Sequence, residues 1–284
     1  MALAQVNGTE IYYEIRGEGE PIVLIPGLGQ GINYYDYAIA HLAQSTKVIA
    51  LELRGTGRSA KPEGPYTMEV WAEDISALLD MLGAEHAHIV GASLGGCIAI
   101  ALAVTHPEKV ASLILVAAFS ELDYTMEMNW RMRLAIVEQV GINSILQDHV
   151  TMWVLSRRFL ETERGRETAR GLREALLLNT PALYAEFLRA ILHFGRVLPG
   201  QEGQPTYTHL LRTIHIPTLL VVGEQDILTP VLFSQKIQEE MPKGVAELEV
   251  IPACGHVTFV EQPEENARLV LEFIERVKQN RDAV

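Results

Sequence analysis

The pattern of apolar and polar positions predicts a chain in which strands and helices alternate. Short continuous apolar runs, typical of strands buried on both faces, are separated by longer segments whose apolar residues recur at helical spacing. The predicted strands are residues 21–25, 47–51, 87–90, 110–116, 218–222 and 248–251, and the predicted helices are residues 36–43, 69–82, 94–104, 231–241 and 263–278. This alternation indicates an α/β protein with a mostly parallel, doubly wound sheet.

Two segments differ from this pattern. Residues 2–16 alternate as two short strands around Asn7-Gly8, a pair typical of hairpin turns. From residue 120 to about residue 212 only helical patterns occur, and we expect this segment to be a helical lid inserted into the sheet domain. The clearest of these patterns are residues 128–140, 171–178 and 183–194. The predicted organisation is a core in two parts, residues 1–119 and 213–284, with the lid, residues 120–212, between them.

Composition and charge exclude several classes of protein. With 48% hydrophobic and 21% charged residues, the chain of 284 residues has the composition of a globular enzyme. Its formal net charge of −13 repels phosphate backbones and anionic lipid surfaces, so we expect neither nucleic acid nor a membrane as a partner. The N-terminus has no basic segment followed by a long apolar run, and no apolar run reaches about eighteen residues. These features favour a cytoplasmic protein.

The two cysteines give no framework of disulfides. Cys97 and Cys254 are expected to be free thiols, and no cluster of Cys, His and carboxylate residues has the spacing of a metal site. We therefore expect no metal. Cys254 lies two residues before a histidine, but buried cysteines usually pack as inert side chains, which favours packing over a second nucleophile.

The sequence Gly91-Ala92-Ser93-Leu94-Gly95 lies where the strand at 87–90 meets the helix at 94–104. A G-x-S-x-G pattern in this context is typical of a nucleophile elbow, in which a tight turn exposes the serine above the sheet. The strand end and the helix start then lie so close that only small residues fit two positions before and after Ser93. The backbone N–H of Leu94, in the first helical turn, would face developing negative charge. The pattern alone also fits a glycine-rich turn without chemistry.

Two further residues complete a catalytic constellation. Asp226 and His256 each follow a predicted strand, as Ser93 does, and residues at the carboxyl ends of parallel strands gather at one edge of a sheet. A serine, a histidine and an acid at that edge can act as nucleophile, base and orienting acid. The strand at 21–25 ends in Pro-Gly-Leu-Gly, and the Leu28 N–H is the predicted second donor to an oxyanion.

With these residues in place, the sequence resembles the α/β-hydrolase fold serine hydrolases, in particular lidded esterases and lactonases. The resemblance rests on GASLGG, LRGTGRS, VVGEQDILTP and ACGHVTFVEQPE, and on the chain order Ser, Asp, His. It covers about residues 9–118 and 216–278, whereas the insertion carries no family signature. Many relatives have His-Gly where this chain has Pro26-Gly27, and Asp is common where this chain has Glu52. A serine at position 93 argues against the haloalkane dehalogenases and epoxide hydrolases of this fold.

The resemblance implies cleavage of carboxylic esters or lactones through an acyl-enzyme on Ser93, with no cofactor. The expected partner is a small-molecule ester or lactone, and the protein is expected to be a monomer or a homodimer. The fold also includes carbon–carbon bond hydrolases, acyltransferases, aminopeptidases and cofactor-free perhydrolases, which the sequence leaves open. A ligand receptor without catalysis is a further alternative.

The lid is rich in large apolar residues, which predicts an apolar acyl or aryl pocket over the serine. The residues expected to line it are Trp130, Trp153, Phe187 and Phe194. We expect substrates with charged acyl groups to be poor, because the lid has no basic cluster clearly directed at the serine. The lid residues that could instead bind a charged acyl group are Arg157, Arg158 and Arg189.

Other residues compete for the catalytic roles. Glu121 and Asp123 follow the strand at 110–116, where some relatives carry their acid, so they are rivals of Asp226. The remaining histidines are expected to be surface or satisfied core residues. Among them, His193 is the lid histidine that we consider as a candidate for another role.

Overall fold

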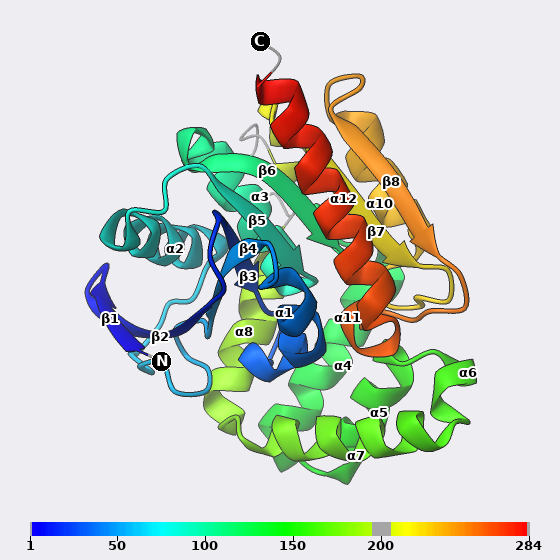
Figure 1. The fold of residues 1–284 in the computed structure, drawn as a ribbon. Helices are drawn as coiled ribbons and strands as arrows, with labels where there is room; N and C mark the ends of the chain where they lie inside the picture. The colour runs from blue at the N-terminus through cyan, green and yellow to red at the C-terminus, as the bar shows by residue number, and fades with distance from the viewer. Residues whose placement is uncertain (1, 195–205, 283–284) are drawn as a thin grey trace.

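A computed structural model describes residues 2–194 and 206–282, and its centre is an eight-stranded sheet (Figure 1). The strand order is β1-β2-β4-β3-β5-β6-β7-β8. The strands are β1 (Ala2–Val6), β2 (Thr9–Arg16), β3 (Glu20–Ile25), β4 (Thr46–Leu51), β5 (Ala87–Ala92), β6 (Val110–Val116), β7 (Thr218–Gly223) and β8 (Ala246–Ile251). Every predicted strand is confirmed, and so is the mostly parallel, doubly wound class.

Antiparallel pairing is confined to one edge of the sheet. β1 pairs with β2 and β2 with β4 in antiparallel register, whereas all other neighbours are parallel. The β1–β2 hairpin turns at Asn7 and Gly8, whose φ angles are both positive at 45° and 69°. This is the backbone that an Asn-Gly pair tolerates and that most other residues avoid.

Helices cover both faces of the sheet, which is why its central strands are buried throughout. On one face α1 (Asp36–Leu42) packs on α12 (Pro263–Asp282), in front of the sheet in Figure 1. On the other face α2 (Met68–Leu82) packs on α3 (Leu94–Thr105), and α10 (Val231–Glu240) covers β7 and β8. Short elements complete the core: the 3₁₀ turns η1 (Ile32–Tyr35), η2 (Pro107–Lys109) and η3 (Leu211–Thr213), and the helices α9 (Tyr207–Leu210) and α11 (Thr258–Glu261).

The segment between β6 and β7 is helical in its described part and lies beyond the carboxyl ends of the strands (Figure 1). It contains α4 (Tyr124–Val140), α5 (Ser144–Val154), α6 (Arg157–Leu160), α7 (Glu163–Leu177) and α8 (Pro181–His193). Residues 195–205 of the predicted lid lie outside the described residues. In the described ranges no single helix is both long and apolar enough to cross a membrane, although the sharply bent pair α7 and α8 together meets that test.

The lid helices begin earlier than the apolar spacing predicted, and the sequence pattern missed α5 and α6. Each begins at a polar residue whose side chain accepts a hydrogen bond from a first-turn N–H. These caps are Asp123, Asn143, Ser156, Thr162 and Thr180. The first half of α7 is charged and exposed, so it carries no apolar stripe that periodicity could detect.

Close backbone packing holds β5 against α3. A Cβ added at Gly91 would overlap the carbonyl oxygen of Gly95, and one added at Gly95 would overlap the carbonyl oxygen of Ile25. At Gly96, an added Cβ would lie 2.5 Å from the Cβ of Ala118. The small residues around the serine are therefore a steric requirement of the strand–turn–helix junction.

We expect Gly95→Ala to destabilise the protein by roughly 1–3 kcal/mol, because backbone atoms cannot move aside as a flexible side chain can. Gly171→Ala is the matched control, since Gly171 is exposed in α7 and nothing lies within 4 Å of its added Cβ. There the substitution is expected to stabilise the helix by roughly 0.5–1 kcal/mol. Urea unfolding of the two variants measures the difference. Equal midpoints for Gly95→Ala and the wild type would contradict the packing argument.

Candidate active site

Ser93 occupies the single-residue turn between β5 and α3 in a strained backbone conformation. Its φ and ψ are 53° and −116°, a combination that is rare for a residue other than glycine. The turn is held by two bonds at 2.8 Å: the Ser93 N–H donates to the Val116 carbonyl, and the Gly96 N–H donates to the Ser93 carbonyl. The backbone therefore fixes the direction in which the Ser93 side chain leaves the turn.

Asp226 and His256 form a buried, hydrogen-bonded pair. His256 Nδ1 lies 2.8 Å from Asp226 Oδ2, and the two residues are only 5% and 4% exposed. The Asp226 carboxylate also accepts from the Leu228 N–H at 2.8 Å and from the Thr229 N–H at 2.9 Å. The Thr229 hydroxyl donates to Asp226 Oδ2 at 2.7 Å. A proton on Nδ1, shared with Asp226, leaves His256 Nε2 as a free acceptor.

Ser93 and His256 line one small cavity of about 70 Å³. Core residues such as Leu28 and Leu228 form part of its wall, and lid residues from α4, α5, α7 and α8 form the rest. The structure thus brings the serine and the histidine to the same enclosed space beneath the lid. Its volume corresponds to about two water molecules, well below the range of a pocket that holds a whole substrate.

Of the two predicted oxyanion donors, Leu28 lines this cavity, and Leu94 is the residue that directly follows Ser93. Leu94 is the first residue of α3, so its N–H precedes the intrahelical hydrogen bonds. Leu28 lines the cavity on a turn in which the Gly27 N–H donates to Gln30 Oε1 at 3.0 Å and the Gln30 N–H donates to the Gly27 carbonyl at 3.2 Å. Gln30 thus holds this turn by hydrogen bonds to Gly27. It is the turn at which this chain has Pro26-Gly27 where many relatives have His-Gly.

Only one of the four predicted apolar lid residues reaches the cavity. Trp130 lines it, whereas the expectation for Trp153, Phe187 and Phe194 is wrong for this cavity. Phe187 packs edge-on against the stacked rings of Tyr66 and Trp71, with centroids 5.2 and 5.0 Å away. Phe194 packs on Phe119 and Tyr207, and Trp153 lies beside His149. Phe187 and Phe194 stabilise the packing of the lid on the core, because large buried aromatic rings contribute strongly to the packing energy.

Sequence reasoning missed Arg133, which lines the cavity on α4 one helical turn after Trp130. The i, i+3 spacing places both side chains on the same helix face, so a lid tryptophan expected at the pocket also implies that Arg133 lies near it. The arginines considered instead lie elsewhere: Arg157 and Arg158 are exposed, and Arg189 pairs with Glu138 and Glu186. The cavity, which was expected to be mainly hydrophobic, thus also has a cationic residue in its wall.

Glu261 joins the lid to the loop that carries His256. Its carboxylate accepts from the Ser156 N–H at 2.7 Å, the Ser156 hydroxyl at 2.6 Å and the Gly255 N–H at 3.1 Å. The Val154 carbonyl accepts from the His256 N–H at 3.0 Å. Burial raises the pKa of Glu261, and the bonds from Ser156 and Gly255 act in the opposite direction. Nothing in the local sequence indicated this contact, which joins residues far apart in the chain.

The residues that competed for catalytic roles have other partners. Glu121 pairs with Lys236 and accepts from Thr208 Oγ1 at 3.2 Å, and Asp123 caps α4. His193 is exposed, and burial raises the pKa of the Cys254 thiol.

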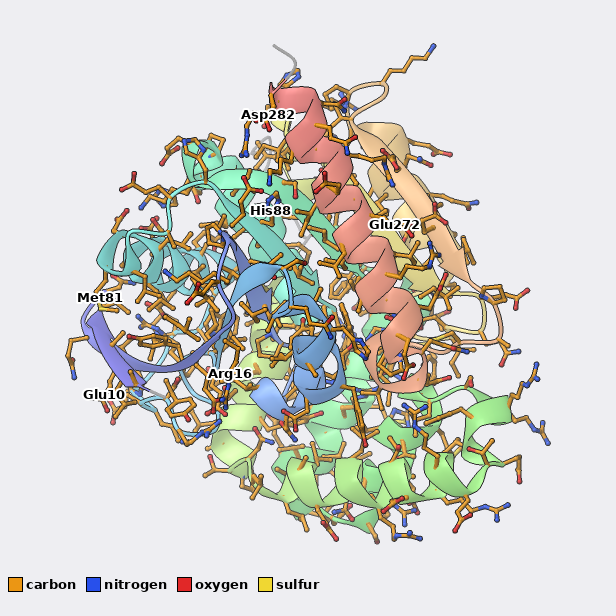
Figure 2. All side chains as sticks on the ribbon, viewed as in Figure 1. Glu10, Arg16, Met81, His88, Glu272 and Asp282 are labelled. Atoms are coloured by element: carbon orange, nitrogen blue, oxygen red, sulfur yellow. The ribbon has the colours of Figure 1, made fainter. Side chains whose placement is uncertain are left out.

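His88, labelled in Figure 2, is a satisfied core residue near the start of β5, at the opposite end of the strand from Ser93. Its Nδ1 lies 2.7 Å from the Ser112 hydroxyl, and its Nε2 lies 3.3 Å from Glu20. Across residues 2–194 and 206–282, no group of three His, Cys, Asp or Glu side chains is placed to hold a metal ion.

The fold and this arrangement place the chain in a known family. The sequence matches the alpha/beta hydrolase fold family over residues 20–263, and the protein belongs to that family. It is 28% identical over 269 residues to a putative carbamate hydrolase RutD of Caulobacter sp. (strain K31), covering 93% of this chain and 95% of the relative. It is also 28% identical over 270 residues to the 2-hydroxymuconate semialdehyde hydrolase of Pseudomonas sp. (strain CF600), covering 91% of this chain and 88% of that one.

Solved structures agree on the fold. The enol-lactonase from Burkholderia xenovorans LB400 superposes with a TM-score of 0.85 at 23% identity, over 96% of this chain and 100% of that chain. The named relatives have different substrates, so family membership supports a hydrolase and leaves the substrate to the site itself.

We expect Asp226→Asn to lower the rate of ester hydrolysis by roughly 10⁴-fold, because the amide would hold His256 in the wrong tautomer. Steady-state kinetics with 4-nitrophenyl acetate measures the loss. Glu121→Gln and Asp123→Asn are the controls, and both should stay within a few-fold of wild type. Activity that survives in Asp226→Asn but is lost in one of these two would assign the acid elsewhere.

Proposed function

We propose that this protein is a serine hydrolase that cleaves carboxylic esters or lactones through an acyl-enzyme on Ser93. The observation that carries the proposal is the shared cavity of Ser93 and His256, together with the buried His256–Asp226 hydrogen bond. A serine beside a histidine that is oriented by an acid is the arrangement by which hydrolases activate a hydroxyl nucleophile.

The proposed reaction has two halves. His256 Nε2 removes the proton from Ser93 Oγ as the oxygen attacks the substrate carbonyl, and the N–H groups of Leu28 and Leu94 stabilise the resulting oxyanion. The same proton passes from Nε2 to the leaving alkoxide as the carbon–oxygen bond breaks. Water then attacks the acyl-enzyme with His256 as base, and Ser93 recovers its proton as the acid product leaves. Asp226 keeps the imidazole oriented and stabilises its cation throughout.

The size of the cavity requires the lid to move when a substrate enters. Helix α7 supports this role, since Leu172, Ala175 and Leu176 cover the cavity while most of the helix is exposed. The end of α5 and the start of α6 are instead held to the His256 loop through Glu261. We therefore assign the opening movement to α7, within a lid that extends from residue 120 to residue 212 and separates the two parts of the core.

Ser93→Ala should lower ester hydrolysis by roughly 10⁴-fold or more while the protein stays folded, because the hydroxyl contributes little packing. Turnover of 4-nitrophenyl acetate measures activity, and near-ultraviolet circular dichroism measures folding. Ser45→Ala changes an exposed serine and is the control. A fluorophosphonate should label Ser93 in the wild type and not in Ser93→Ala. A wild-type protein that is neither labelled nor active would favour the ligand-receptor alternative.

A further inference from the structure

The side chain of Arg133 is a buried cation at the cavity that holds Ser93. The residue is 2% exposed, and it lines the same enclosed space as Ser93 and His256. Among the described residues, its Nε and Nη2 atoms have no hydrogen-bond partner, and no carboxylate forms an ion pair with it. Buried guanidinium groups are normally paired, because an uncompensated charge away from water is costly. The guanidinium forms a hydrogen bond with the Tyr184 side chain, but the described residues supply no counter-charge, which points to an external one.

The three side chains that interact with the guanidinium, those of Trp130, Tyr184 and His149, are neutral. The Trp130 ring lies beneath it, 4.6 Å from the guanidinium carbon to the ring centroid. Tyr184 lies beside it, and burial raises the pKa of that phenol, so the tyrosine carries no charge. Burial and the charge of Arg133 together lower the pKa of His149 to about 4, so this imidazole is neutral as well. An arginine keeps its proton under these conditions, so the charge stays unbalanced.

Unpaired donors are concentrated on one face of α4. Trp130 Nε1 is also buried without a hydrogen-bond partner among the described residues, and Trp130 lines the cavity one turn before Arg133. The amide oxygen of Asn129 is unpaired too, but that residue does not line the cavity. Two residues that line the cavity therefore carry unpaired NH donors, two nitrogens of the guanidinium and the indole nitrogen. Such a set is the complement of an anion rather than of an apolar acyl chain.

We propose that Arg133, with Trp130 beside it, binds a carboxylate group of the substrate. The substrate class would be esters or lactones that carry a second, free carboxylate, such as half-esters of short dicarboxylic acids. A planar guanidinium matches a carboxylate with two parallel hydrogen bonds. The remaining wall includes apolar side chains such as Val150, Val154 and Leu172, which suit a small carbon skeleton that carries one anionic group. This inference rests on the proposed function and specifies its substrate.

The test compares two esters of nearly equal shape, monoethyl succinate and ethyl levulinate, in which a methyl ketone replaces the carboxylate. The wild type should show a kcat/KM for monoethyl succinate about 10- to 100-fold above that for ethyl levulinate, as expected for charge-assisted hydrogen bonds to a buried guanidinium. Arg133→Met should bring this ratio close to one, and Arg133→Lys should restore only part of it, because an ammonium cannot form the paired bonds. Arg189→Met is the control, since it removes a lid arginine that already has carboxylate partners and should leave the ratio intact.

A structural role for Arg133 gives a different result. If the arginine only supports the lid, Arg133→Met lowers kcat/KM for both esters together and leaves their ratio unchanged, and that outcome overturns the proposal. A wild type with no preference for the anionic ester overturns it without any variant.

A binding measurement keeps the inference separate from the reaction. Ser93→Ala should bind succinate in a calorimetric titration, and Ser93→Ala combined with Arg133→Met should bind it at least about tenfold more weakly. Failure of the proposed function would appear as no turnover of either ester and no fluorophosphonate label, with succinate binding intact. Equal succinate binding by the two proteins would overturn the carboxylate site and leave the serine chemistry untouched.

Discussion

The close approach of β5 to α3 is the constraint on which the site depends. Because Gly91 lacks a Cβ, β5 lies close against the backbone of α3, and because Gly95 lacks one, α3 lies close against the end of β3. One residue completes the turn between β5 and α3. Ser93 is that residue, and its strained φ and ψ are maintained by hydrogen bonds to Val116 and from Gly96. The main chain thus sets the direction of the Ser93 side chain at the edge of the sheet.

The parallel register supplies the other half of the arrangement. β5, β6, β7 and β8 are consecutive neighbours in the sheet, so the loops after β5, β7 and β8 emerge side by side. Asp226 and His256 meet on these loops, and the turn after Asp226 gives its carboxylate two backbone donors and one hydroxyl donor. The acid is therefore held by its own loop as well as by the histidine.

The lid is attached unevenly, which matters for how the cavity opens. Glu261 bonds to Ser156 and Gly255, so the junction of α5 and α6 is coupled to the loop that carries His256. By contrast, Gly165 and Leu176 are the buried residues of α7. The part held by Glu261 lies next to His256, and α7 lines the cavity. In a protein with a net charge of −13, the cavity beneath this cover contains an arginine without a counter-ion among the described residues.

The sequence alone determined the strand order along the chain, the place of the helical insertion and the pairing of Ser93, Asp226 and His256 with strand ends. These features follow from local patterns: apolar runs, glycines at a tight turn, and the rule that parallel strands share an edge. The local sequence also places the backbone N–H groups of Leu28 and Leu94, because one follows a strand end and the other begins a helix.

Only the tertiary structure decided which lid side chains reach the cavity. A helix has a face toward the core and a face toward the site, and apolar residues occupy both, so Phe187 and Phe194 could not be separated from Trp130 by composition. The sequence does not predict a buried Arg133, because a charged residue in a helix is normally exposed. Its burial depends on how α4 packs against α8. Glu261 likewise acts through residues distant in sequence. Contacts of this kind depend on the packing of whole helices, which no local pattern encodes.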